Sequence, residues 1–327
     1  MSEAFRHVDR DQTIVFGAEA LGAAGELLGD GYTLLTTERA TGSAPSLAER
    51  AVDVVHVPAG MVDVVSAELR PKVTGNRLVA LGGGRVIDVA KALAAADAPR
   101  EVAAVPTSLS GAEMTGVHRH AKGVADATPR VRATVVLNDP ALSASQPVDE
   151  LAASSANALG HAITALVSEH STTIARAVAA DAIGELAAGW PGDEPDRARV
   201  ALGALLAGWA VDRSGLGPHH ALTQTAVRMT SLEHAHVNAA LLPHTAAAMR
   251  ARNADRFERL DAALGRTIES LAEELRGRAG VTGLGEISTD TELLAHAVAA
   301  AAKRSELARV TPALEQEEVA AIYHTAA

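Results

Sequence analysis

Two regions of the chain follow different hydrophobic patterns, and this contrast restricts the fold more than any other feature. Over the first 140 residues, short β-branched runs such as TIVFG, VDVVHV and RLVALGGG alternate with helical stretches such as MVDVVSAELR and RVIDVAKALAAA. Strand followed by helix, repeated, is typical of a mainly parallel sheet covered by helices. The first region therefore predicts a Rossmann-like α/β domain.

The pattern changes after Pro147, where β-branched runs become rare. Segments such as VDELAASSANALGHAITALVS and RARVALGALLAGWAVDR are rich in Ala and Leu and have helical periodicity. We therefore predict an α/β domain over residues 1–148 and an all-α domain over residues 149–327.

Charge and composition restrict the partners. The chain has 40 acidic and 29 basic residues and a formal charge of −11, which opposes binding to nucleic acid or to an anionic membrane. It contains no cysteine, so disulfides and thiolate metal sites are excluded. The N-terminus is charged where a signal peptide needs an apolar core, and no apolar run reaches the roughly 20 residues of a membrane span. We expect a cytoplasmic protein that acts on a small molecule.

Three consecutive glycines, Gly82, Gly83 and Gly84, follow a predicted strand and begin a predicted helix in LGGGRVIDVAKA. Glycines let the backbone approach a ligand closely, and the free N–H groups at a helix start attract phosphate. An ordinary tight turn is the alternative, since the run is not the GxGxxG motif. On the helix, Asp88 and Lys91 form either a surface pair or part of a ligand site.

A second loop, PTSLSGAEMT, follows the strand candidate VAAV. Its hydroxyl residues Thr107, Ser108 and Ser110 suit a nucleotide site, because parallel strands present their carboxyl ends at one edge of a sheet. The alternative is that these hydroxyls satisfy their own backbone.

Histidines form the third constellation. Asn157 and His161 are four residues apart on a predicted helix and therefore share one face, while His220 and His234 flank another helix. Such residues hold a metal, transfer protons, or cap and pack helices.

These motifs, in this order, resemble the iron-containing (group III) alcohol dehydrogenase family of the dehydroquinate synthase-like superfamily, and most closely its maleylacetate reductase branch. The matching segments include FGAEAL, LGGGRVIDVAKA, VPTSLSGAEMT, PRVRATVVLNDPAL, NALGHAITAL and GLGPHHALTQTAVRMTSLEHAHVNAALLPH. The resemblance implies a nucleotide-binding α/β domain, a helical domain with the active site in the cleft between them, a homodimer, and reduction of a substrate by NADH or NADPH.

The resemblance also assigns the cofactor site. Gly82, Gly83 and Gly84 correspond to the pyrophosphate site, and Thr107, Ser108 and Leu109 to positions along the cofactor. To these we add Asp88 and Thr37. No Asp follows the second strand to bind the adenosine ribose, and Arg39 there either meets a 2′-phosphate or is a solvated charge, so the choice between NAD and NADP stays open.

Metal-dependent members of this family ligate an ion with one Asp and three His. The matching positions here are Asn157, His161, His220 and His234, and Gln224 replaces another histidine of the site. A neutral amide ligates a divalent cation weakly, so we expect no functional metal. If Zn²⁺ or Fe²⁺ binds, the three histidines are its predicted ligands.

We predict a reductase of the maleylacetate reductase type for a small unsaturated or keto substrate, which is expected to carry carboxylates. His161, His220, His234 and Asn157 are the predicted catalytic residues, because imidazoles titrate near neutral pH and can deliver a proton. The predicted substrate contacts are His219, Gln224, Arg213 and His118.

Two alternatives remain. Arg85, in place of the usual Ser after the glycines, and apparently shortened loops suggest a family member that has lost redox chemistry and performs an elimination, isomerisation or cyclisation. The other alternative is a binding protein without catalysis.

Overall fold

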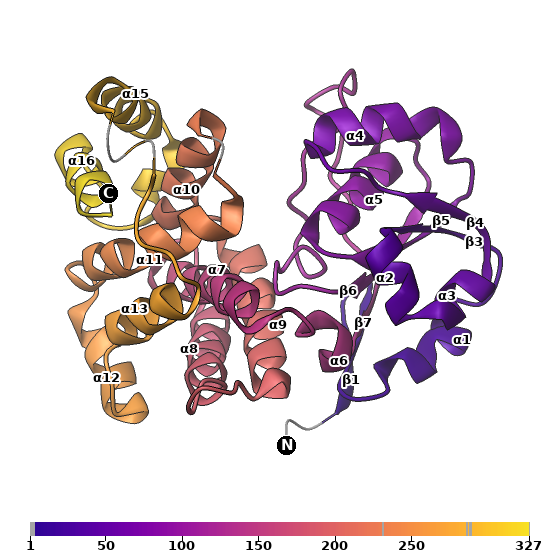
Figure 1. Cartoon of the computed structure of the whole chain (residues 1–327), viewed down its shortest axis with the longest axis horizontal. Coiled ribbons are helices and arrows are strands. Elements are labelled where there is room, and N and C mark those ends of the chain that lie inside the picture. Colours follow the sequence, from indigo (N-terminus) through magenta and orange to yellow (C-terminus); the bar gives the residue numbers. More distant parts are fainter. Residues whose placement is uncertain (1–3, 231, 286, 288–289, 327) are drawn as a thin grey trace. The chain divides into compact units, whose positions relative to one another are not determined.

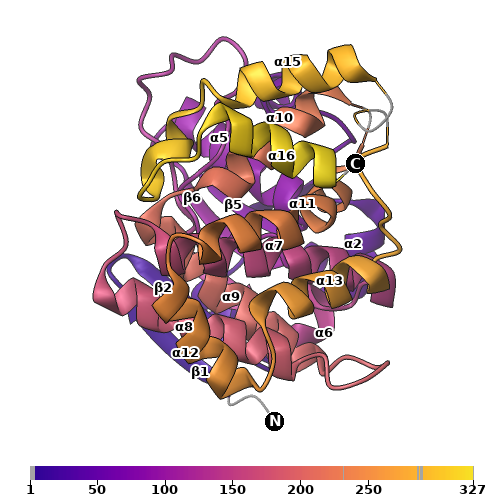
Figure 2. The same ribbon diagram turned by 90° about the vertical axis from the view of Figure 1, so that its left-hand side faces the viewer.

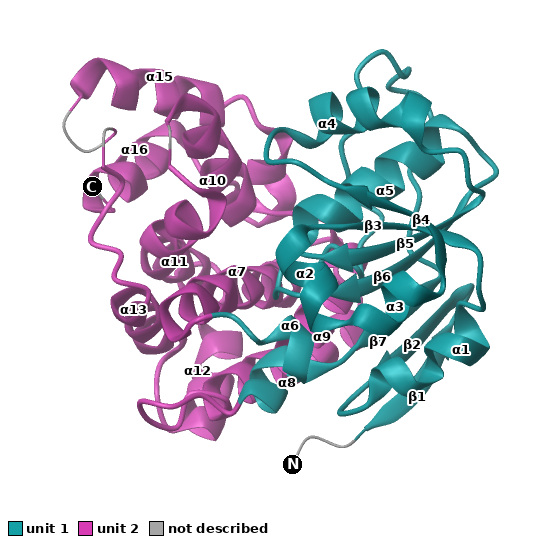
Figure 3. Ribbon diagram, turned by 45° about the vertical axis from the view of Figure 1, so that its right-hand side comes forward, with its two compact units in different colours: residues 1–146, 197–202 teal, residues 147–196, 203–327 magenta. Residues whose placement is uncertain are grey.

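The computed structural model describes residues 4–230, 232–285, 287 and 290–326. The chain divides into two compact units (Figure 3). Unit 1 comprises residues 1–146 and 197–202, and unit 2 comprises residues 147–196 and 203–327. The domain boundary at residue 148 stays a prediction.

Unit 1 contains a seven-stranded sheet with the order β1-β2-β7-β6-β5-β3-β4. Every pair of neighbouring strands is parallel except β1 and β2. The predicted mainly parallel sheet is therefore confirmed. The strands are β1 (Phe5–Asp9), β2 (Gln12–Phe16), β3 (Tyr32–Thr36), β4 (Ala51–His56), β5 (Arg77–Gly82), β6 (Glu101–Pro106) and β7 (Val135–Asn138).

The central strands β3, β5 and β6 consist of nearly continuous apolar residues because both faces of the sheet are covered. Leu34, Val79, Leu81, Val105 and Leu137 belong to one buried core cluster. The helices of unit 1 are η1 (Ala20–Ala23), α1 (Ala24–Leu27), α2 (Glu38–Ser43), α3 (Pro45–Glu49), α4 (Val62–Leu69), η2 (Arg70–Lys72), α5 (Gly84–Ala96) and α6 (Pro140–Ser143).

The described residues of unit 2 form helices and loops, which confirms the predicted helical region. Helix α7 lies in its centre and packs against α8, α10, α11 and α13 (Figures 1 and 2). The helices are α7 (Val148–Val167), α8 (Thr173–Ala188), α9 (Arg197–Ser214), α10 (Pro218–Met229), α11 (His234–Arg250), α12 (Ala254–Leu264), α13 (Ile268–Arg278), α15 (Thr291–Ala301), η3 (Ser305–Arg309) and α16 (Gln316–Thr325).

Helix α7 is buried on all sides, since every residue from Ser155 to Val167 is buried. Its small residues let the neighbouring helices approach closely. Such close packing is needed because the chain has few aromatic side chains to fill wider gaps. Within the described residues, no helix is long and apolar enough to span a membrane.

Candidate functional site

The glycine run joins β5 directly to α5. Strand β5 ends at Gly82, and Gly83 is the N-cap of α5 with φ −75°. A Cβ on Gly82 would lie 2.6 Å from Val86 Cγ2, and a Cβ on Gly84 would lie 2.9 Å from Ser110 Oγ. Residues 82 and 84 need to be glycine because neighbouring side chains occupy the space that a Cβ would take. The φ of Gly83, by contrast, is one that any residue adopts. Close packing against Val86 and Ser110 therefore explains two of the glycines, and the phosphate-site interpretation stays a prediction.

The serine loop, residues 107–111, lies directly beside the glycines. Strands β5 and β6 are parallel neighbours, so both loops leave the same edge of the sheet. Thr107 N donates to Gly82 O at 3.0 Å, and a Cβ on Gly83 would lie 3.1 Å from Ser108 Oγ. We call residues 82–84 and 107–111 the loop site.

Two further predicted cofactor residues, Thr37 and Leu109, lie in different environments. Thr37 follows β3 and caps α2, where its Oγ1 accepts from Ala40 N at 3.3 Å. The side chain of Leu109 is buried, which leaves its backbone for a ligand. The cofactor roles of both residues stay predictions.

Lys91 fixes the segment that follows the serine loop. Its side chain is 0% exposed, and Nζ lies 2.8 Å from Asp88 Oδ1. The same Nζ donates to the carbonyl oxygens of Ala112, Thr115 and Val117 at 2.9, 3.0 and 3.0 Å. The surface-pair interpretation of Asp88 and Lys91 is therefore wrong, because an ammonium with these partners is a buried clamp between α5 and residues 112–117. A cofactor contact for Asp88 stays a prediction.

Glu113, which the sequence analysis did not single out, is buried beside this clamp. Burial raises the pKa of its carboxyl group to about 7, and the charge of Lys91 opposes the shift. Its Oε2 has no hydrogen-bond partner among the described residues. In the sequence, the only sign that Glu113 is buried was its position inside the small-residue segment SGAEMT.

Unit 2 contains a histidine cluster, which we define as Asn157, His161, His219, His220 and His234. Helix α7 supplies Asn157 and His161, α10 supplies His219 and His220, and α11 begins at His234. The rings of His161 and His220 stack with centroids 4.4 Å apart and an interplanar angle of 4°. The His219 ring meets His220 edge-on at 5.1 Å. Tertiary packing thus joins residues from distant parts of the sequence.

Several polar atoms of this cluster are buried without a partner. Within the described chain, Asn157 Oδ1, His161 Nδ1 and both ring nitrogens of His220 make no hydrogen bond. An unsatisfied buried polar group costs about 1–3 kcal/mol, and buried polar groups normally have partners. These four atoms are therefore the strongest candidates in the unit for contact with a ligand.

The stacked imidazoles are neutral at physiological pH. Burial lowers the pKa of His161 to about 3, and repulsion from His219 and His234 adds to this effect. The pKa of His220 is also lowered well below its usual value, first by burial and then by His161. The expectation that these rings titrate near neutral pH is wrong for the free site, because desolvation disfavours the imidazolium.

The two other histidines of the cluster have different environments. His234 is exposed at the first position of α11. His219 is buried, with Nδ1 2.8 Å from Thr245 Oγ1 and Nε2 2.8 Å from Asn238 Oδ1. Asn238 and Thr245 were not predicted, since amide and hydroxyl residues on a helix give no specific signal.

The remaining predicted substrate residues have structural partners. Gln224 Oε1 accepts from Arg304 Nη2 at 3.0 Å, and the Arg213 guanidinium lies 3.5 Å from the centre of the Trp209 ring. In unit 1, burial lowers the pKa of His118 to about 4, and its ring bonds the backbone of Arg119 and Val131. Their substrate roles stay predictions, and His118 has no charge at neutral pH to offer a carboxylate.

The predicted metal ligands do not fit a shared ion. A lone pair of an imidazole lies in the ring plane, and the nearly parallel planes of His161 and His220 do not converge on one point. Asn157 brings no negative charge. In the part of the chain that the structure describes, no group of three or more His, Asp or Glu residues is placed to hold a metal.

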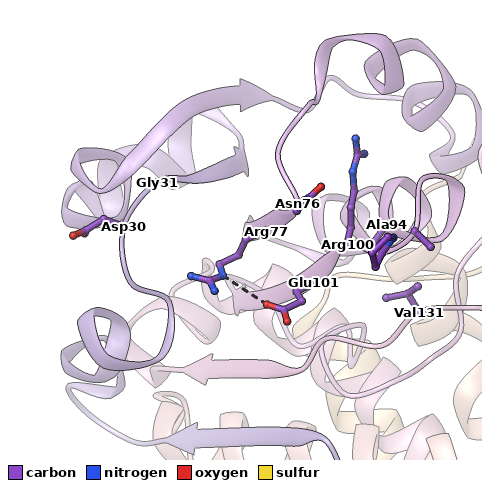
Figure 4. Close-up of a pocket in the computed structure, with 10 residues that line it drawn as sticks. Asp30, Gly31, Asn76, Arg77, Ala94, Arg100, Glu101 and Val131 are labelled. Carbon is purple, nitrogen blue, oxygen red and sulfur yellow. Dashed lines mark ion pairs between the residues drawn. The ribbon is translucent and has the colours of Figure 1, made fainter.

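A cavity of about 570 Å³ lies elsewhere in unit 1 (Figure 4). Arg77 and Glu101, at the first positions of β5 and β6, line it with their side chains 3.7 Å apart. It therefore lies at the amino ends of these strands, opposite the loop site, and its lining includes none of the predicted site residues.

Known protein sequences and solved structures include relatives of this chain. Residues 151–327 match the profile of the Fe-containing alcohol dehydrogenase family, C-terminal. Maleylacetate reductase 2 of Cupriavidus pinatubonensis is 34% identical over 221 residues, which cover 65% of this chain and 61% of that protein. Maleylacetate reductase of Sphingobium indicum is 31% identical over 274 residues, which cover 77% of each chain.

Among solved structures, maleylacetate reductase from a Rhizobium species matches with a TM-score of 0.82 and 25% identity, over 100% of this chain and 98% of that one. The predicted fold class and family are thereby confirmed. Since the family profile covers more than half of the sequence, the chain belongs to the Fe-containing alcohol dehydrogenase family.

Proposed function

We propose that the protein is an NAD(P)H-dependent reductase of the maleylacetate reductase type. Its relatives bear that name, and maleylacetate is an unsaturated keto dicarboxylate of the predicted substrate class. The observation that carries the proposal is the stacked pair His161–His220, in which His161 Nδ1 and both ring nitrogens of His220 are buried without a partner among the described residues. Such atoms suit contact with the reacting part of a substrate.

The loop site supports the assignment of the cofactor. Its glycines add no side chains at the start of α5, and a helix start is favourable for a pyrophosphate. A bound nicotinamide supplies a hydride for the electrophilic carbon of the substrate. Either NADH or NADPH fits these features, since Arg39 is exposed at the end of β3 and no Asp is present there.

The histidine cluster then acts on the charge that develops. Hydride addition to a carbon conjugated to a ketone leaves an enolate oxygen, which needs hydrogen-bond donors. A neutral imidazole donates through its N–H, so one ring of the stacked pair, His161 or His220, can stabilise this oxygen without being protonated. His234 has an exposed position at the start of α11 although burial of its ring lowers its pKa, and we assign it the proton that completes the reduction.

The non-redox alternative gains no support from Arg85. Its side chain is exposed on the first turn of α5. Its exposure gives no sign that it blocks the glycines, and we retain the reductase assignment. A homodimer, a cytoplasmic location and the lack of a nucleic-acid partner remain predictions from the sequence, the first of which light scattering during gel filtration would check.

The test is oxidation of NADH and NADPH by the chelator-treated protein with maleylacetate. We expect substrate-dependent oxidation of at least one cofactor. Folded protein that oxidises neither, with or without added Zn²⁺ or Fe²⁺, would overturn the reductase assignment. Oxidation that appears only after metal addition would overturn its metal-free part.

A further inference from the structure

His219 contacts every structural element of the histidine cluster while offering a ligand no free nitrogen. We propose that His219 is a positioning residue, which holds α7, α10 and α11 in the arrangement that stacks His161 on His220. This proposal rests on the proposed function for its kinetic consequences, whereas its structural basis can be tested independently.

The contact with α7 passes through Gly160, the residue before His161. A Cβ on Gly160 would lie 2.6 Å from Cδ2 and 2.8 Å from Nε2 of His219. The imidazole therefore occupies the space that a side chain at residue 160 would need, and the backbone of α7 rests on the ring. Any displacement of the ring would move His161 with the helix.

The contacts with α11 are hydrogen bonds. His219 Nε2 lies 2.8 Å from Asn238 Oδ1, and Asn238 Nδ2 donates to the carbonyl oxygen of His234 at 3.0 Å. His219 Nδ1 lies 2.8 Å from Thr245 Oγ1, about two turns further along the same helix. Two bonds on one helix fix the plane of the ring as well as its position.

These bonds select one tautomer of His219. Because the Asn238 amide nitrogen faces His234 O, its oxygen faces His219, and Nε2 must carry the hydrogen. Nδ1 then accepts the single hydrogen of the Thr245 hydroxyl, whose alternative acceptors are the carbonyl oxygens of Leu241 and Leu242 at 3.1 Å. Both ring nitrogens of His219 are therefore used within the protein.

The ring also sets the orientation of His220. Its edge meets the His220 face at 88°, while His161 covers His220 in parallel. His220 makes no hydrogen bond of its own within the described residues. Two ring contacts therefore bear on the orientation of its two nitrogens, and His219 supplies one of them.

The kinetic test compares His219→Phe with His219→Gln. Phe keeps a ring without hydrogen bonds, and Gln keeps a donor for Asn238. We expect kcat for maleylacetate reduction to fall roughly 10- to 100-fold in the Phe variant, as for a catalytic group displaced by about 1 Å, and to recover partly in the Gln variant. The KM for the nicotinamide should stay within about twofold, because the loop site belongs to unit 1.

Gly160→Ala approaches the same contact from α7 and should lower kcat in the same range. The matched control is His236→Phe, since among the described residues His236 bonds the carbonyl of Gly283 and makes no ring contact with the cluster. We expect a nearly unchanged kcat. Wild-type kcat in folded His219→Phe and Gly160→Ala would overturn the proposal.

Nitrogen-15 NMR of the wild-type histidines separates this proposal from the proposed function. We expect His219 as the Nε2–H tautomer, assigned by its loss in His219→Phe, and a change of its signal in Asn238→Leu. An Nδ1–H tautomer would overturn the proposal. Absence of reductase activity would remove the proposed function alone, because this spectrum needs no substrate.

Discussion

The loop site of unit 1 and the histidine cluster of unit 2 differ in what shapes them. The loop site is formed by backbone at the carboxyl ends of neighbouring strands, and close contacts to Val86 and Ser110 explain its glycines. The cluster is formed by side chains from three helices, with four polar atoms left unpaired. The first arrangement suits a ligand held by its phosphates, and the second suits a ligand that changes its bonding.

The buried ammonium of Lys91 holds the segment that follows the serine loop, so Lys91→Met should have the largest effect on stability. Removing the ammonium leaves Asp88 and three carbonyl groups without their partner. We expect a loss of about 3–5 kcal/mol in the free energy of unfolding, the usual cost of breaking a buried pair. Urea denaturation measures it, with exposed Lys72→Met as control. If Lys91→Met and Lys72→Met were equally stable, the proposed role of Lys91 as a buried clamp would be wrong.

The second prediction separates the two sites by function. His220→Ala should lower kcat about 10²- to 10³-fold, the range seen when one donor to a developing oxyanion is removed. The dissociation constant for NADH should stay the same, because the loop site is intact. Steady-state kinetics and nicotinamide fluorescence measure the two quantities. A parallel loss of NADH binding would mean that the sites are not separate.

Glu113 allows a test by pH. Its pKa is about 7 in the folded protein and 4.5 in the unfolded reference, so the folded state holds the extra proton between these values. The stability contribution is therefore complete below pH 4.5 and decreases as the pH rises to about 7. Relative to Glu113→Gln, wild type should lose up to about 3 kcal/mol over this range. A difference between the two that does not change with pH would contradict the raised pKa.

The smallest effect is expected for Gly84→Ala. The added methyl would press on the Ser110 side chain at 2.9 Å and shift the serine loop. We expect NADH to bind about tenfold more weakly, equivalent to about 1.4 kcal/mol. Gly22→Ala is the control, since an added Cβ there meets no atom within 4 Å. The double variant Gly84→Ala/Ser110→Gly should restore binding. If it does not, the contact between residues 84 and 110 does not explain the weaker binding.

Sequence periodicity predicted the buried strands of the sheet but not its edge strand β1. The buried strands are apolar runs, but β1 reads FRHVD and was missed, because its three central residues are exposed and carry no strand pattern. The glycine and serine motifs were recognisable because their function depends on backbone and strand order, which the sequence shows directly.

Side-chain environments could not be predicted in the same way. Lys91 is buried because three carbonyls from a distant loop surround it, and its helix gives no sign of that loop. His219 and His220 are adjacent on α10 and point in different directions, yet both are buried, since α10 packs against α7, α11 and α15. Periodicity alone cannot assign opposite roles to two neighbouring histidines.

The proposed function has two parts: reduction by a bound nicotinamide cofactor, and independence from a catalytic metal. The most direct measurement is a fluorescence titration of the chelator-treated protein with NADH and NADPH, followed by addition of maleylacetate. We predict saturable binding of at least one cofactor and loss of its fluorescence when maleylacetate is added. Binding or oxidation that occurs only after Zn²⁺ or Fe²⁺ is supplied would contradict the second part.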